Sequence, residues 1–231
     1  MAWYILAGRT PVRFHWTHIR WRLLSGILRI GSLSAINSIL TNLVIAGTTA
    51  LVASVAGVAA VAGFGTGVRL EYLLIPLIFG IGAPMVALVG TNLGAGHRDR
   101  ARRIALTGAG FAFAVTEIIG LVAALFPAAW MQLFTHDPVA IETGSEYLHI
   151  VGPFYGFFGL GLSLYFASQG AGRLFWPVMA GFARLTVAVG GGFLALYLSG
   201  SMSLVFVAVA ASLSIYGLIV FAAVRTKAWI G

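Results

Sequence analysis

Long apolar stretches separated by short charged segments dominate the chain. Between Arg29 and Arg98 lie 68 residues whose only charged side chains are Arg69 and Glu71. A soluble domain cannot bury that much uncharged chain, whereas roughly 20 apolar residues cross a hydrocarbon core of ~30 Å as a helix. This stretch therefore predicts two membrane-spanning helices, and the rest of the chain repeats the pattern.

The apolar pattern predicts an all-α integral membrane protein with six transmembrane helices. We expect a basic cytoplasmic segment over residues 1–23, a six-span membrane region over 24–224, and a tail over 225–231. The expected spans are residues 24–52, 58–93, 104–126, 140–168, 174–198 and 202–224. Composition agrees, because the chain is 60% hydrophobic and only 9% charged, against about 25% charged in globular proteins.

The charges between the spans predict the orientation. Every second connection carries arginines, and the connections between them carry no Lys or Arg. Of the 14 Lys and Arg residues, 12 lie in or beside the arginine-bearing connections and the two termini, and only Arg69 and Arg184 lie elsewhere. Because cytoplasmic loops are enriched in Lys and Arg, both termini are predicted to be cytoplasmic. The net charge of +8 is explained in the same way, without a nucleic-acid partner.

The segment 13–22, RFHWTHIRWR, interleaves aromatic residues with arginines. One interpretation is an interfacial helix that lies on anionic headgroups. An equally weighted interpretation is a cytoplasmic linker with tryptophans at the membrane boundary.

Charged residues within spans are costly and usually pair or face a cavity. Glu117 in the third span and Arg184 in the fifth are expected at similar depths, so we predict that they form an ion pair or share a polar cavity. A pair that only orients helices is an equal alternative. Arg69 and Glu71 are expected near the outer boundary, unless the second helix is longer than an ordinary span and buries them. Pro76 is one residue that makes such a broken helix plausible.

Further polar residues complete the set of pathway candidates. Asn37, Thr41 and Asn42 lie on the first span, and Tyr155 and Tyr165 on the fourth. Such side chains join helices by hydrogen bonds more often than they bind substrate. Pro153 in the fourth span and Pro177 near the start of the fifth are candidate hinges. Glu142 and Glu146, with His149 close by, are interpreted as a wet outer helix start, with cation entry as the rarer alternative.

Enzyme chemistry has little support in the sequence. The chain has no cysteine, and neither an HExxH motif nor a nucleophile elbow is present. VAGFGTGVRLE resembles a dinucleotide-binding fingerprint but lies within an apolar span, without the strand and turn that such a motif needs.

Several segments together resemble one family of transporters. The longest is VAGFGTGVRLEYLLIPLIFGIGAPMVALVGTNLGAGHRDRARR; the others are LRIG, WMQLFTHDPVAIETGSEYLHI and YFASQGAGRLFWPVMAGFARL. In order and spacing they are similar to the carboxy-terminal six-helix lobe of multidrug and toxic compound extrusion (MATE) transporters, over residues 28–223.

The resemblance implies a fold and an activity. Family members are usually twelve-span proteins whose two six-span lobes enclose a cavity and alternate access. They export organic cations against proton or sodium gradients. By this resemblance we expect one lobe of a two-lobe antiporter in the bacterial inner membrane, without a cofactor or a bound metal. The second lobe would be a missing amino-terminal half, a partner chain or a second copy.

The chain departs from the family at the coupling residues. In the sodium-coupled branch, the resemblance implies a glutamate near the position of Thr41 and an aspartate near Leu160, and neither acid is present. In another branch the coupling aspartate belongs to the absent lobe. Glu117 is therefore a candidate coupling residue because of its position within a span, and the family resemblance does not supply it.

Three functions remain open on the sequence. The first is cation-coupled export of amphipathic, cationic compounds. The second is a truncated or non-transporting membrane subunit. The third is flipping of lipid-linked precursors, for which Arg184 is the sole support.

Overall fold

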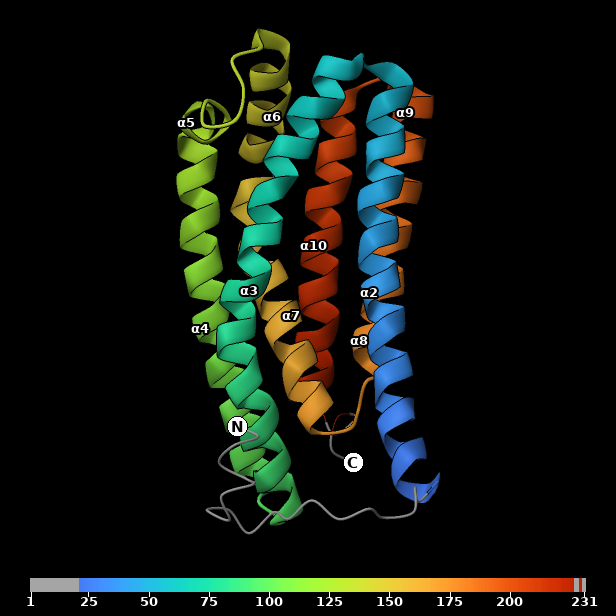
Figure 1. Cartoon of the computed structure of the whole chain (residues 1–231), viewed down its shortest axis with the longest axis vertical. Coiled ribbons are helices and arrows are strands. Elements are labelled where there is room, and N and C mark those ends of the chain that lie inside the picture. The colour runs from blue at the N-terminus through green and yellow to red at the C-terminus, as the bar shows by residue number, and fades with distance from the viewer. Residues whose placement is uncertain (1–20, 227–228, 230–231) are drawn as a thin grey trace, which may run out of the picture.

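The protein is a bundle of long, nearly parallel helices (Figure 1). The computed structural model describes residues 21–226 and residue 229, and within them every regular element is helical. The predicted basic segment 1–23, with its arginine- and aromatic-rich stretch 13–22, lies outside the described residues except at its very end. The all-α fold class is confirmed.

The described residues contain six helices long and apolar enough to cross a membrane, as predicted. The spans are α2 (Trp21–Val55), α3 (Val58–Gly94), α4 (Arg98–Leu125), α6 with α7 (Pro138–Val151 and Tyr155–Gly170), α8 with α9 (Phe175–Leu185 and Gly192–Ser199), and α10 (Met202–Arg225). A short helix, α5 (Pro127–Met131), lies between the third and fourth spans. Five of the six spans begin close to the expected positions, but α4 begins at Arg98 instead of residue 104 because its arginines form the first helical turn.

Glycines allow the chain to reverse direction between spans. Gly96, Gly172 and Gly200 have positive φ angles of 82°, 66° and 64°, and they follow α3, α7 and α9. This left-handed conformation after a helix is one that only glycine adopts without steric cost. The short turns therefore connect helices that run antiparallel to each other.

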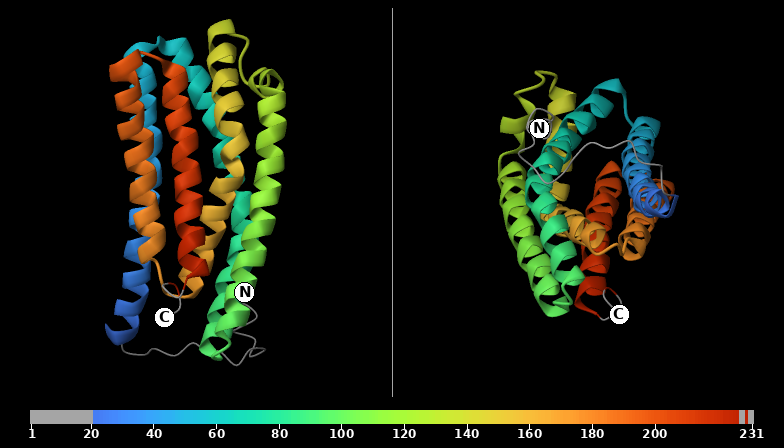
Figure 2. Two further views of the ribbon diagram at one scale, coloured as in Figure 1. Left: turned by 180° about the vertical axis from the view of Figure 1, so that it is seen from behind. Right: turned by 60° about the horizontal axis from the view of Figure 1, so that its bottom comes forward.

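Helix α7 occupies the middle of the bundle and packs against α3, α4 and α10, whereas α2 packs mainly against α8. The other views show α2 and α8–α9 on the side of α10 opposite to α4 (Figure 2). Helix α3 crosses the bundle obliquely and runs from the neighbourhood of α2 to that of α4 (Figure 1). This long diagonal helix connects the two sides of the lobe.

Helix α2 begins at the same end of the bundle at which α10 finishes, together with the α3–α4 and α7–α8 turns (Figure 1). This end carries the basic connections, including Arg98, Arg100 and Arg103. We call it the arginine end. Its cytoplasmic location stays a prediction from the charge pattern.

Two spans contain irregular turns. In the fourth, a 3₁₀ turn at Gly152–Phe154 separates α6 from α7, where Pro153 removes a backbone donor. In the fifth, six residues of π-helix, Thr186–Gly191, separate α8 from α9. The predicted hinge at Pro177 is wrong, because this proline lies in the first turn of α8, where its missing N–H has no helical partner to lose.

Glycines also set the distance between helices, as small residues do in membrane proteins. A Cβ added to Gly120 of α4 would collide with the carbonyl oxygen of Gly152 and would lie 3.0 Å from the Cβ of Tyr155. The backbones of α4 and of the irregular turn in the fourth span are therefore in direct contact.

Candidate functional site

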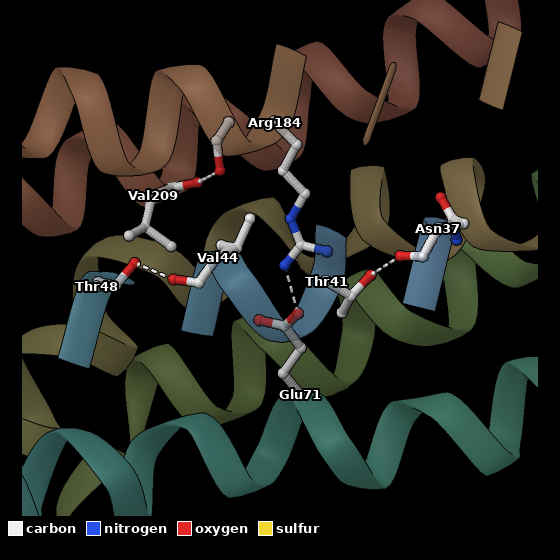
Figure 3. A network of polar contacts seen from close by, with 8 residues as sticks. Asn37, Thr41, Val44, Thr48, Glu71, Arg184 and Val209 are labelled. Carbon is white, nitrogen blue, oxygen red and sulfur yellow. Dashed lines mark hydrogen bonds and ion pairs between the residues drawn. The ribbon is translucent and has the colours of Figure 1, made fainter. Parts of the chain in front are cut away.

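A buried ion pair joins the second and fifth spans. The Nη2 atom of Arg184 in α8 donates to Oε1 of Glu71 in α3 at 2.5 Å, and both side chains are about 95% buried. Figure 3 shows the two side chains reaching toward each other from their helices, with Asn37 and Thr41 of α2 beside them. The guanidinium also lies over the rings of Phe158 and Tyr216, with its central carbon 5.2 and 5.8 Å from their centroids.

The pair lies deep within the spans. Glu71 is five residues from the central residue of α3, which corresponds to about 8 Å along the helix axis. Arg184 is three residues from the centre of the fifth span, or about 5 Å. Of the two alternatives that the sequence left open for Glu71, the structure shows burial, because α3 is one continuous helix of 37 residues, longer than an ordinary span. This is the longer second helix that the sequence left open.

The predicted pairing of Glu117 with Arg184 is also wrong. Glu117 lies on α4 and is half-buried, and its Oε2 accepts a hydrogen bond of 2.8 Å from the backbone N–H of Gly156. Gly156 is in the first turn of α7, directly after the irregular turn. The carboxylate therefore satisfies a backbone donor that the broken helix leaves without a carbonyl partner.

A cavity of about 290 Å³ lies beside the ion pair. Its lining comes from α2, α3, α7, α8 and α10, and it includes three of the predicted residues of α2, namely Asn37, Thr41 and Asn42. Among the lining residues in the described part of the chain, Arg184 is the one with a charged side chain, and its partner Glu71 is not part of the lining. Five aromatic residues contribute the largest apolar surfaces: Tyr72, Phe158, Tyr165, Phe166 and Tyr216.

The polar lining residues are held in two ways. Thr41 and Asn42 donate to carbonyl oxygens of their own helix, at Asn37 and Ser38, over 3.1 and 2.9 Å. Gln169 of α7 instead connects two helices, because its Nε2 donates to Tyr165 Oη at 2.8 Å and to Ser34 Oγ of α2 at 3.0 Å. This contact links α2 to α7 on the arginine-end side of the cavity.

The remaining predicted residues lie outside the cavity. Arg69 is exposed, and its guanidinium carbon lies 5.2 Å from the ring centroid of Phe134. Tyr155 is fully buried in the hydrophobic core, where its hydroxyl has no hydrogen-bond partner among the described residues. Of the predicted set, the structure therefore brings together Asn37, Thr41, Asn42 and Tyr165 with the Glu71–Arg184 pair.

The acidic start of the fourth span is partly wet. Glu142 and His149 are exposed, as predicted, whereas Glu146 is half-buried and accepts a hydrogen bond from Ser203 of α10. This contact gives Glu146 a role in joining α6 to α10.

The family model described as MatE matches residues 34–194. That range includes the ion pair and nearly all of the cavity lining. The chain belongs to the MatE family. Because α10 completes the bundle beyond residue 194, the matched range corresponds to the first five spans of this MatE lobe.

Two curated relatives and one solved structure define the extent of the likeness. The chain is 29% identical over 175 residues to a probable multidrug resistance protein NorM of Thermotoga maritima, covering 73% of this chain and 37% of the relative. It is 31% identical over 109 residues to an FAD transporter of Shewanella oneidensis, covering 47% of this chain and 24% of the relative. A MATE protein crystallised in complex with MaL6 superposes with a TM-score of 0.88 at 19% identity, covering 98% of this chain and 52% of that one.

The chain thus spans about half the length of the solved MATE structure that it matches. The superposition shows the fold, and it confirms that the six helices form one lobe of the larger MATE architecture.

Sequence reasoning missed several lining residues of this MatE lobe, among them the polar residues Ser38, Tyr72, Gln169 and Tyr216. Gln169 and Tyr216 are isolated polar groups within apolar spans, the same signal that identified Asn37. Of the two tyrosines named on the fourth span, Tyr165 faces the cavity and Tyr155 does not. Choosing between them required knowledge of which face of α7 turns toward α2.

Proposed function

We propose that the chain is one lobe of a secondary active transporter that exports amphipathic compounds by cation-coupled antiport. One observation carries the proposal: a membrane-depth cavity whose charged lining group, Arg184, is neutralised by a single buried carboxylate, Glu71. Membership in the family supports a transport function. The ion pair beside the cavity supplies a group that can couple transport to an ion gradient.

Protonation of Glu71 would change the charge of the cavity. In the paired state the two charges cancel, and the aromatic walls offer apolar contact and cation–π attraction to an organic cation. A proton on Glu71 removes the negative charge, so Arg184 becomes an uncompensated positive group in the lining. Its repulsion would then expel the cation, which gives antiport without a second acidic site. A sodium ion on the carboxylate would act in the same sense.

Alternating access then requires a second lobe. A cavity of 290 Å³ is at the lower limit of ligand pockets, which are about 300–1,000 Å³. A drug-sized molecule would therefore be bound between this lobe and another one. The three sources expected from the sequence apply: an amino-terminal half, a partner chain or a second copy.

An anionic substrate is the second candidate, and Arg184 is the observation that favours it. An arginine is well suited to bind phosphate or carboxylate, and one relative is named an FAD transporter. Transport would then be symport and not antiport, because protonation of Glu71 would strengthen the binding of an anion. The substrate charge therefore decides whether substrate and proton move in opposite directions or together.

Flux in vesicles of the native membranes tests the proposal. We expect uptake of a fluorescent organic cation that depends on a proton or sodium gradient. The E71Q substitution should reduce this flux at least tenfold, because the cavity then carries a permanent positive charge. The matched control is E142Q, which removes an exposed carboxylate at the wet end of α6 and should leave the flux unchanged.

Three outcomes would contradict the proposal. Gradient-dependent flux through a folded E71Q protein at the wild-type rate would remove Glu71 from the coupling step. An absence of flux in every oligomeric form, for cationic and anionic probes alike, would favour a non-transporting membrane subunit. Movement of a labelled lipid-linked precursor without cation flux would favour the flippase alternative.

A further inference from the structure

A second and larger cavity lies between α3 and α4 at the arginine end, and the proposed transport mechanism does not use it. Its volume is about 1150 Å³, which is above the usual range of small-molecule pockets. Residues of α3, the α3–α4 turn and the first turns of α4 form its walls. It is separate from the cavity beside the ion pair, since the two share no lining residue.

The lining is divided between charge and apolar surface. Arg98, Arg100 and Arg103 lie at one end with His97, and Asp99 is the one acidic lining residue in the described part of the chain. All five are exposed, so the charged end keeps a net positive charge. The rest of the lining is mostly apolar: Ile81, Pro84, Met85, Leu88 and Ile104, with Thr107 and Gly108 farther along α4.

Close packing of the two helices forms the floor of the groove. Met85 is buried, and its Sδ would lie 2.5 Å from a Cβ added to Gly108. Pro84 and Leu88 remain exposed on the wall. The apolar wall is therefore open along its length, whereas its base is filled.

We propose that this groove binds an anionic phospholipid, with the phosphodiester against the arginines and one acyl chain along the apolar wall. Guanidinium groups bind phosphate oxygens through paired, charge-assisted hydrogen bonds. A free phosphate would use the charged end and leave the apolar wall empty. An amphiphile matches both ends in the order in which they occur from the helix turn toward the membrane centre.

The position within the bundle supports a lipid as the occupant. The arginine end is the end that the charge pattern assigns to the cytoplasmic leaflet. That leaflet contains anionic lipids, and basic pockets between transmembrane helices on this side bind their headgroups. Arg100 and Arg103 are three residues apart on α4 and therefore share one helical face, which allows both to contact one phosphate group.

Lipid binding to the full-length chain tests the proposal, with native mass spectrometry of the detergent-solubilised protein as the readout. We expect phosphatidylglycerol to bind more tightly than phosphatidylcholine. The R100Q/R103Q variant should weaken phosphatidylglycerol binding roughly 25-fold. The matched control is R173Q/R225Q, which removes two arginines at the same end but outside the groove lining and should change the affinity less than threefold.

A third variant separates a lipid from a free anion. L88W fills the apolar wall and leaves every arginine in place. It should weaken phosphatidylglycerol binding about tenfold without changing binding of inorganic phosphate. Equal losses in the two arginine pairs, unchanged lipid binding in L88W, or equal affinity for the two phospholipids would each overturn the proposal. If a second lobe filled the groove, two of these results would appear together: the two arginine pairs would lose equally, and L88W would leave lipid binding unchanged.

Discussion

At the scale of single residues, the buried ion pair of Glu71 and Arg184 is costly to form. Removing two charges from water costs several kcal/mol per ion in effective terms, and mutual attraction offsets this only when the contact is close. Here the contact is 2.5 Å, and Phe158 and Tyr216 add cation–π attraction on the faces of the guanidinium. Such a costly pair, placed against a cavity, is better explained by function than by stability.

Removing one partner should destabilise the fold more than removing both. E71M leaves Arg184 buried without a counter-charge and should reduce the free energy of unfolding by about 3–5 kcal/mol. E71M/R184M replaces the pair by apolar groups and should recover most of that loss, while transport stays abolished. Thermal unfolding in detergent measures both variants. A double variant as unstable as the single one would show that the charge pair itself stabilises the bundle.

Glu117 accepts a backbone hydrogen bond from Gly156 instead of pairing with an arginine. Gln and Ala substitutions distinguish this structural role from a role in coupling. Gln keeps an oxygen that can accept the Gly156 N–H, so we expect E117Q to lose less than about 1 kcal/mol of stability and to retain flux. E117A leaves that donor unsatisfied and should cost about 1–3 kcal/mol. The same unfolding and flux assays apply. Loss of gradient-driven flux in a stable E117Q protein would instead make Glu117 the coupling acid.

At the scale of elements, the sequence predicts helices better than it predicts their irregularities. Charged connections and turn glycines delimit the spans clearly, so six helices follow from the pattern. The 3₁₀ turn at Gly152–Phe154 has a visible signal in Pro153. The π-helix at Thr186–Gly191 contains no proline, and its one signal is the run of glycines 190–192 that begins within it. A missing donor can be read from sequence, but an extra residue within a helical turn depends on the packing around it.

Contact between backbones at the broken fourth span gives a prediction about α4. G120A places a methyl group against the Gly152 carbonyl and should destabilise the protein by about 1–3 kcal/mol. G110A is the matched control, ten residues earlier on the same helix, where a Cβ meets nothing within 4 Å. It should be neutral or stabilise by up to about 1 kcal/mol. Equal unfolding temperatures for the two variants would contradict the close contact between α4 and this turn.

At the scale of the whole molecule, position along a span does not say which helices face each other. Glu117 and Arg184 were paired because both lie within the membrane at similar depths. The structure shows that depth is one coordinate only: α4 lies on the far side of the bundle from α8, while the oblique path of α3 brings Glu71 to Arg184 (Figures 1 and 3). The order of helices around a bundle depends on packing between segments that are distant in sequence.

The architecture of one lobe also predicts the size of the transporting unit. We expect an active unit of about twice the 24.3 kDa of this chain, because the cavity in one lobe is small for a drug-sized substrate. Blue native electrophoresis of native membranes, detected with an antibody against the carboxy-terminal residues, measures it. Gradient-driven flux from a unit of 24.3 kDa would contradict the need for a second lobe.

The central claim is that the cavity beside the ion pair is a water-accessible pathway whose exposure changes with the coupling ion. Since the chain has no cysteine, a single T41C substitution reports on the cavity, I118C on the exposed outer face of α4, and S199C on the turn at the opposite end from the arginines. We would measure labelling of each by a membrane-impermeant, water-soluble thiol reagent, with and without an ion gradient. We predict that T41C reacts at a rate that the gradient changes several-fold, while I118C stays inert and S199C reacts equally in both conditions. If T41C is as inert as I118C in every condition, the cavity is not a transport pathway.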